Sequence, residues 1–86
     1  MAPELLRVTR VTPWDALWII KGETIEDIPR WVTLKTTDAW KAALCDRGLQ
    51  TGALVWVTWR RALRGDDWLQ TIEPDTTTFQ HEEAAS

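Results

Sequence analysis

Apolar residues alternate with polar ones in several short segments, and this period of two constrains the fold more than any other feature of the sequence. The alternation is cleanest in residues 31–36, where Val32 and Leu34 fall on one face of an extended chain. It recurs in residues 53–61, the strongest candidate strand. Runs of this length, bounded by polar residues and turn formers, are typical of β-strands. The chain is therefore predicted to be mainly β.

Three less regular segments complete the predicted strands. Residues 5–12 are rich in Leu, Val and Thr, and a β-bulge near Arg10 would return Val11 to the apolar face. The other two predicted strands are residues 16–21 and residues 67–73, ended by a glycine and a proline respectively.

One segment between the third and fourth strands has the period of a helix. Thr37 or Asp38 can cap its first turn, and Gly48 is suited to the left-handed residue that ends a helix. We expect Trp40 on this helix to belong to the core. The residues that recur at helical spacing are Trp40, Ala43, Leu44 and Arg47.

The element order β-β-β-α-β-β resembles that of the OB-fold, a five-stranded, partly open Greek-key barrel. The resemblance covers about residues 4–74. More narrowly, residues 31–74 look like small phage and bacterial OB-type proteins, which resemble single-stranded nucleic-acid-binding proteins. The shared segments are T-D-A-W-K-A-A-L in the helix, V-W-V-T-W in the fourth strand and I-E-P after the fifth. We expect an OB-like barrel in residues 1–74 and a flexible acidic tail in residues 75–86, with an SH3-like barrel as the alternative.

Seven tryptophans in 86 residues are more than a core of this size can hold. Each indole has about 150–250 Å² of surface and an N–H group that needs a partner. Some tryptophans are therefore expected at a binding face. Trp59 and Trp68 are predicted to be structural, as Trp40 is.

The resemblance to the OB-fold implies a binding face on the second and third strands, flanked by loops. If Leu17 and Ile19 face the core, Trp18 and Trp31 point outward and can stack on bases. The alternative is that these two tryptophans form a cross-strand pair that only stabilises the hairpin. The remaining residues predicted for this face are Lys21, Arg30 and Lys35, with Trp14 and Trp56 as possible additions.

The turn between the last two strands has the densest group of cations in the chain. Arg60, Arg61 and Arg64 lie within five residues, and guanidinium groups bind phosphates well. The alternative is a solvated turn in which these arginines pair with Asp66 and Asp67.

Catalysis finds little support in the sequence. The single cysteine, Cys45, has no activating partner, and the single histidine, His81, lies in the tail. Paired carboxylates, metal-ligand spacing and a glycine-rich phosphate loop are not found. We expect a protein that is not an enzyme and has no cofactor or metal.

The net charge is −3, but four of the 13 acidic residues follow Ile72, so residues 1–72 carry ten cations against nine anions. No apolar stretch approaches the roughly 18–20 residues that span a bilayer, and the N-terminus lacks the pattern of a signal peptide. A cytoplasmic protein without a membrane partner is expected.

These observations favour a binding module for single-stranded DNA, or RNA, with little sequence preference. The alternative is a protein-interaction module on the same fold, for example a small phage or mobile-element inhibitor or a self-associating subunit, because Trp and Arg are also frequent at protein interfaces. The acidic tail is interpreted as a solubilising terminus, as a competitor of nucleic acid for the basic face, or as a docking segment for a partner protein.

Overall fold

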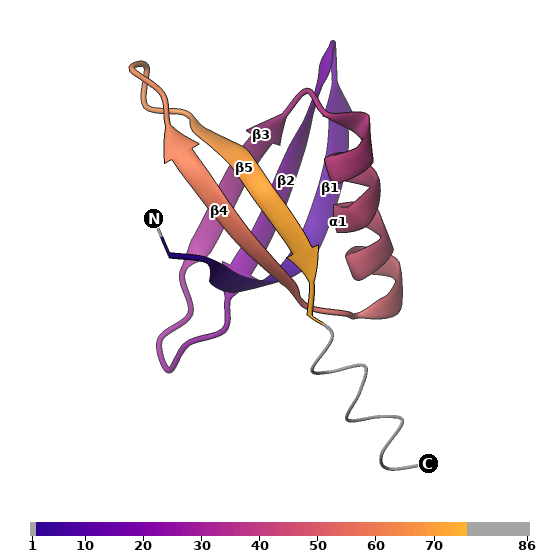
Figure 1. Cartoon of the computed structure of the whole chain (residues 1–86), viewed down its shortest axis with the longest axis vertical. Coiled ribbons are helices and arrows are strands. Elements are labelled where there is room, and N and C mark those ends of the chain that lie inside the picture. Colours follow the sequence, from indigo (N-terminus) through magenta and orange to yellow (C-terminus); the bar gives the residue numbers. More distant parts are fainter. Residues whose placement is uncertain (1, 76–86) are drawn as a thin grey trace.

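The structure is a computed structural model that describes residues 2–75. Five strands close into a barrel in the order β1-β2-β3-β5-β4, with one helix between β3 and β4 (Figure 1). The predicted OB-like barrel is thereby confirmed. Within residues 2–75, no helix has the length and apolar character needed to cross a membrane. The elements are β1 (Glu4–Trp14), β2 (Leu17–Thr24), β3 (Trp31–Thr36), α1 (Ala39–Thr51), β4 (Val55–Arg61) and β5 (Asp67–Pro74).

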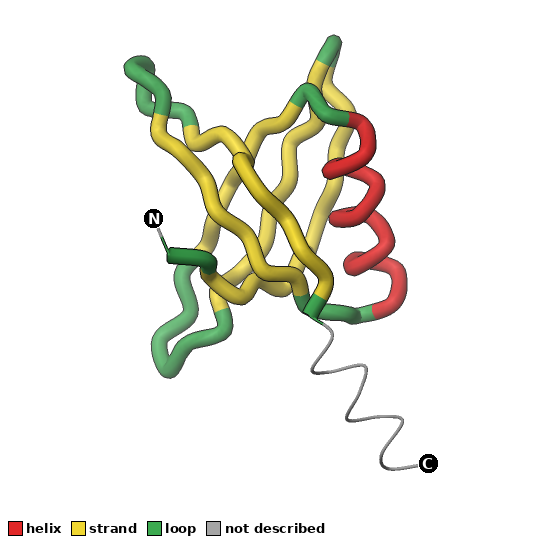
Figure 2. The backbone as a smooth tube through the Cα atoms, viewed as in Figure 1, coloured by secondary structure: helices red, strands yellow, loops and turns green. Residues whose placement is uncertain are grey.

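The long strand β1 belongs to both layers of the barrel, which cross each other in Figure 2. Its first residues pair with β4, and the rest of the strand pairs with β2. The register shifts between Val8 and Arg10, which confirms the predicted bulge. As expected, the bulge returns Val11 to the inner face, where it packs against the core.

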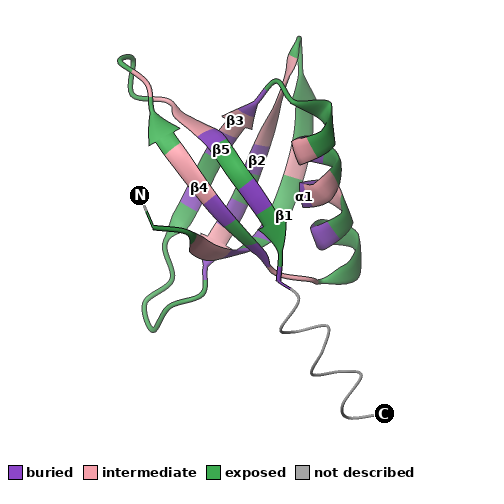
Figure 3. Ribbon diagram, viewed as in Figure 1, coloured by how far each residue is buried: buried purple, intermediate pink, exposed green. Residues whose placement is uncertain are grey.

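The core is built from the inward faces of all five strands and from one side of α1 (Figure 3). Strand β3 has the predicted facing, because Val32 and Leu34 are buried. Strand β2 has the opposite facing to the prediction. Ile20 is fully buried and pairs with Leu34, so Trp18 lies on the same inward side of the pleat.

A second register shift lies between β4 and β5. Thr58 pairs with Thr71 and Trp59 pairs with Leu69, which leaves Gln70 as an extra residue on β5. This bulge turns both Leu69 and Ile72 inward, although strict alternation would separate them. Trp59 shares the inward side of β4 with the buried Val55 and Val57 and packs against the core.

Helix α1 begins as predicted and ends later than predicted. The side chain of Asp38 accepts hydrogen bonds from the backbone N–H groups of Trp40 and Lys41, which caps the first turn. The helix continues past Gly48 and ends at Gly52, whose φ of 75° is left-handed. Gly48 serves instead for close packing, since a Cβ atom there would lie 3.1 Å from the carbonyl oxygen of Ala53.

The prediction that Trp40 is a core residue is wrong, because 66% of its surface is exposed. The helix packs on the barrel through small side chains, Ala42, Cys45 and Gly48, which lie on a different face from Trp40. Small residues let the helix approach the barrel closely, and a large indole does not fit between them.

Asp75, which the sequence analysis placed in the tail, directly follows β5 and is hydrogen-bonded to the barrel. Asp75 is buried, its backbone N–H donates to the carbonyl of Leu54, and its carboxylate accepts from the indole N–H of Trp56 at 3.3 Å. The barrel therefore includes Asp75. The rest of the predicted tail, residues 76–86, lies outside the described residues.

Strands β3 and β5 close the barrel through a single residue pair, Lys35 with Trp68. The preceding residues of β3, Trp31 to Leu34, pair with β2 on one side only. A gap in the strand pairing is therefore left along one edge of β3.

Candidate functional site

A cleft of about 380 Å³ lies along the unpaired edge of β3. One wall is β3 itself, with the side chains of Trp31, Thr33 and Lys35. The other wall is the hairpin that joins β4 to β5, with Trp59, Arg61 and residues 65–67. The volume falls in the range of pockets that hold small organic groups.

Trp31 is the most exposed apolar residue in this cleft, with 73% of its surface open to solvent. Its backbone is fixed by pairing with Glu23 of β2. The core residues Val32 and Leu34 alternate with it, which forces its side chain to the outside of the barrel. The indole is thus offered from a rigid strand, with its ring available for stacking.

Two ion pairs neutralise part of the positive charge in the cleft. The ammonium group of Lys35 lies 3.2 Å from a carboxylate oxygen of Asp66 and joins the two walls. The Nε of Arg61 lies 3.1 Å from Asp67, which raises the pKa of that guanidinium through a hydrogen bond and opposite charge. Both pairs are partly open to solvent, so each contributes little to stability and can exchange its partner at low cost.

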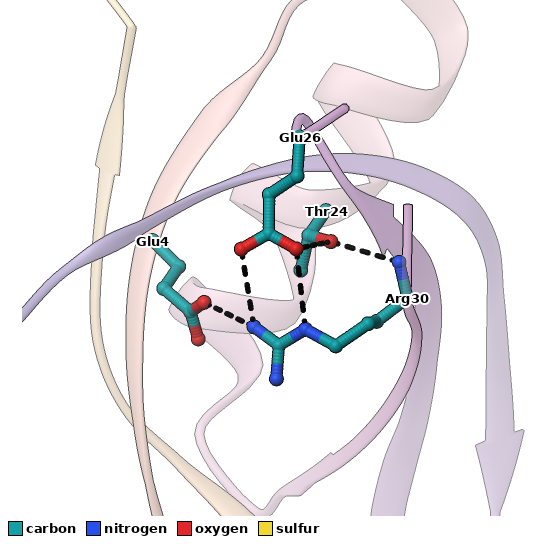
Figure 4. Close-up of polar contacts among 4 residues, drawn as sticks. All are labelled: Glu4, Thr24, Glu26 and Arg30. Carbon is teal, nitrogen blue, oxygen red and sulfur yellow. Dashed lines mark hydrogen bonds and ion pairs between the residues drawn. The ribbon is translucent and has the colours of Figure 1, made fainter. Parts of the chain in front are cut away.

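Arg30 lines the cleft just before β3 begins and is held by two carboxylates (Figure 4). Its guanidinium donates to both oxygens of Glu26 and to Glu4. Its backbone N–H donates to the hydroxyl of Thr24 at 2.9 Å, and that hydroxyl donates to Glu26 at 3.1 Å. This network fastens the loop between β2 and β3 across its base.

The Arg30 network shifts the acid–base behaviour of its members. Hydrogen bonds from Arg30, and then from Thr24, lower the pKa of Glu26 below its ordinary value of 4.5. The hydrogen bond to Glu26 and the charge of Glu4 raise the pKa of Arg30. The charge of Arg30 is thus already matched within the protein, and its guanidinium is less available to an anionic ligand than the sequence suggests.

The cleft brings together some of the residues predicted from the sequence. Trp31, Arg30, Lys35 and Arg61 all line it. Pairing of arginines in the turn with the neighbouring aspartates occurs for Arg61.

The three other tryptophans predicted for the face do not line this cleft. Trp18 is on the core side of β2, so the prediction that it points outward is wrong, and it lies opposite Thr36 rather than Trp31. The alternative of a Trp18–Trp31 cross-strand pair is therefore wrong as well. Trp14 is 65% exposed at the β1–β2 hairpin. Trp56 lies on β4, and its indole N–H donates a hydrogen bond to Asp75.

The three remaining predicted cations, Lys21, Arg60 and Arg64, do not line the cleft. Lys21 is exposed on β2 and lies opposite Thr33, a residue of the cleft wall. Arg60 lines a smaller hollow beside Leu63 and Trp68, and Arg64 is exposed at the tip of the hairpin. Among residues 2–75, none of these three cations forms an ion pair.

The sequence analysis missed Trp59 and Asp66 as cleft residues. Trp59 is partly buried and packs against the core, as a structural residue does, but it also lines the cleft. The bulge at Gln70 that positions its partner Leu69 has no clear sequence signal. Asp66 meets Lys35 across 31 positions of sequence, a contact that only the closed barrel creates.

Neither a reactive thiol nor a metal site is found among the described residues. Burial raises the pKa of the Cys45 thiol from 9.0 to about 12, so it stays protonated near neutral pH. No group of three or more His, Cys, Asp or Glu side chains in residues 2–75 is arranged to hold a metal ion. His81 lies outside the described residues.

Comparison with known proteins gives no relative, since no family model, curated protein or solved structure matches the chain. The fold is therefore assigned from the strand order and the position of the helix alone.

Proposed function

We propose that this protein is a non-catalytic binding module for single-stranded nucleic acid, which it holds in the cleft between β3 and the β4–β5 hairpin. The observation that carries the proposal is the exposed indole of Trp31 on the wall of that cleft, between Arg30 and Lys35. Single strands present flat bases beside a phosphate chain. Indoles stack on the bases and cations neutralise the phosphates.

The ion pairs in the cleft are compatible with this role. A phosphate can replace Asp66 beside Lys35, because a partly exposed ion pair contributes little to folding. Stacking is sequence-tolerant, since every base has a flat face. We therefore expect modest affinity, strong dependence on salt and little base preference.

The test compares two tryptophans of similar exposure. Trp31→Ala is expected to weaken binding of an oligothymidylate by roughly 5- to 150-fold, because stacking contributes about 1–3 kcal/mol per base. Trp40 is 66% exposed on α1, away from the cleft, and Trp40→Ala should leave the affinity unchanged. Fluorescence anisotropy of a labelled oligonucleotide at low salt measures both. Equal losses in the two variants, or no loss in either, would contradict the proposal.

A second candidate function is recognition of a protein partner at the same cleft. The pairing of Lys35 and Arg61 with aspartates favours it, because those charges are already balanced without a polyanion. Trp31 would then be an anchor in the centre of an interface. If the wild-type protein binds no oligonucleotide up to high micromolar concentration at low salt, this second candidate replaces the first.

A further inference from the structure

Two cations face each other on the outer surface of the barrel, next to the cleft but not in it. Arg10 of β1 lies directly opposite Lys21 of β2. Val11 and Ile20, the next residues along each strand, point to the core. Arg10 and Lys21 therefore share the outer face, and both are exposed.

This pair of like charges has no ionic partner within residues 2–75. The carboxylate on the adjoining row, Glu23, lies 3.5 Å from Arg7 and is engaged by it. Like charges directly opposite each other in an antiparallel sheet are unfavourable. The fold keeps an unfavourable arrangement here that a bound anion would relieve.

The bulge of β1 produces this juxtaposition. Without the extra residue, Lys21 would lie opposite Thr9, and Arg10 would turn toward the core. The hydroxyl of Thr9 donates to the carbonyl of Lys21 at 3.2 Å, which fastens the two strands at the bulge. The position of the two cations is thus set by backbone geometry and not by flexible side chains alone.

The row that contains the two cations ends at the cleft. Arg10 lies opposite Lys21, and Lys21 lies opposite Thr33, whose side chain belongs to the cleft wall. With about 4.8 Å between strands, the backbone of Lys21 lies roughly 5 Å from that of Thr33, and the backbone of Arg10 roughly 10 Å from it. A strand that leaves the cleft across β2 and β1 would pass both of them.

We propose that Arg10 and Lys21 form a second phosphate-binding point, which holds the backbone of a single strand roughly two to four nucleotides beyond the base stacked on Trp31. This inference rests on the proposed function. It assigns a direction to the bound strand, from the β4–β5 hairpin across β3 and β2 to β1. It also gives Arg10, which the sequence analysis did not select, a role in binding.

The experiment uses oligothymidylates of two lengths, two and about 12 nucleotides, with the wild type and the variant Arg10→Gln/Lys21→Gln. A dinucleotide is too short to reach from Trp31 to the second binding point. With the longer oligonucleotide, the variant should lower the slope of log affinity against log salt by about 1.4, and affinity at 50 mM salt by at least about tenfold. With the shorter one, wild type and variant should agree. Arg47→Gln, an exposed cation on α1 without an ion pair in residues 2–75, is the control and should change neither slope.

A charge reversal separates a binding role from a structural one. Lys21→Glu replaces a like-charge pair with an ion pair, so the melting temperature should rise or stay the same while affinity for the longer oligonucleotide falls.

The outcomes distinguish the two proposals. If the wild type binds both lengths and the variants keep its salt slope, the second binding point is wrong and the cleft proposal stands. If the wild type binds neither length, both are wrong.

Discussion

Trp31 and Trp40 illustrate how differently two exposed indoles can be placed. Both are largely open to solvent, but only Trp31 stands in a concave site with cations beside it. Single exposed apolar residues are normal on protein surfaces, whereas a convergent set of aromatic and charged groups in a cleft is a sign of a binding site. Exposure alone therefore does not identify a functional tryptophan.

Asp66 is the residue that most directly opposes an anionic ligand, because it holds Lys35 at 3.2 Å. In Asp66→Asn the ammonium group is released and one negative charge leaves the cleft. We expect oligonucleotide affinity to rise by about two- to fivefold, the equivalent of the usual strength of an exposed ion pair. The same titration by anisotropy measures it. A weaker complex would show that Asp66 contributes to binding directly.

Among the elements, the loop between β2 and β3 is held by a titratable group, the carboxylate of Glu26, which accepts hydrogen bonds from Arg30. Because the folded pKa of Glu26 is lowered, its contribution to stability is present above pH 4.5 and is lost as the pH falls through the lowered value. Thermal unfolding of the wild type and Glu26→Gln should therefore differ at pH 7, and the difference should shrink as the pH falls below 4.5. A difference that does not shrink as the pH falls below 4.5 would show that the charge of Glu26 is not the cause.

Strand β2 passes very close to β1 at Gly22. A Cβ atom there would lie 2.6 Å from the carbonyl oxygen of Arg7 and 2.9 Å from the Cγ atom of Leu6. Gly22→Ala should lower the free energy of unfolding by about 1–3 kcal/mol through overpacking. Urea unfolding measures the loss, and Thr12→Ala, exposed on the same sheet, should stay within about 0.5 kcal/mol of wild type. Unchanged stability of Gly22→Ala would refute the close approach.

The sequence was sufficient to predict which side chains face the core in elements with one apolar face. It was insufficient where apolar residues occupy both faces. Strand β3 alternates strictly, so its facing was predictable. Strand β2 has four consecutive apolar residues from Leu17, and only its pairing with β3 decides which of them are buried. In α1 the packing face consists of Ala42, Cys45 and Gly48, whose small size gives a weaker periodic signal than Trp40.

The candidate site was predictable to a similar degree. Trp31 and Lys35 follow from the alternation of β3, and the arginine turn is visible as a cluster. The ion pairs that balance the cleft were only partly predictable. Asp67 is a near neighbour of Arg61, but Lys35 and Asp66 meet only after the barrel has closed.

At the scale of the whole molecule, positive charge occurs in local groups of side chains and not as a net positive charge. The chain carries a net charge of −3, so long-range attraction cannot be what brings a polyanion to it. Binding of a single strand must then depend on short-range contacts with the cleft and with the unpaired cations around it. This is the reason why the proposed contacts are tested by salt slope and oligonucleotide length together.

The single residue pair between β3 and β5 has a consequence for the behaviour of the protein at high concentration. Unpaired strand edges are templates on which another chain can form a sheet. Here charged side chains, including the ion pair between Lys35 and Asp66, cover the edge of β3. The opening that we propose as the ligand site is thus also the place where we expect copies of the protein to join edge to edge. Any change that widens the cleft would favour aggregation as well as binding.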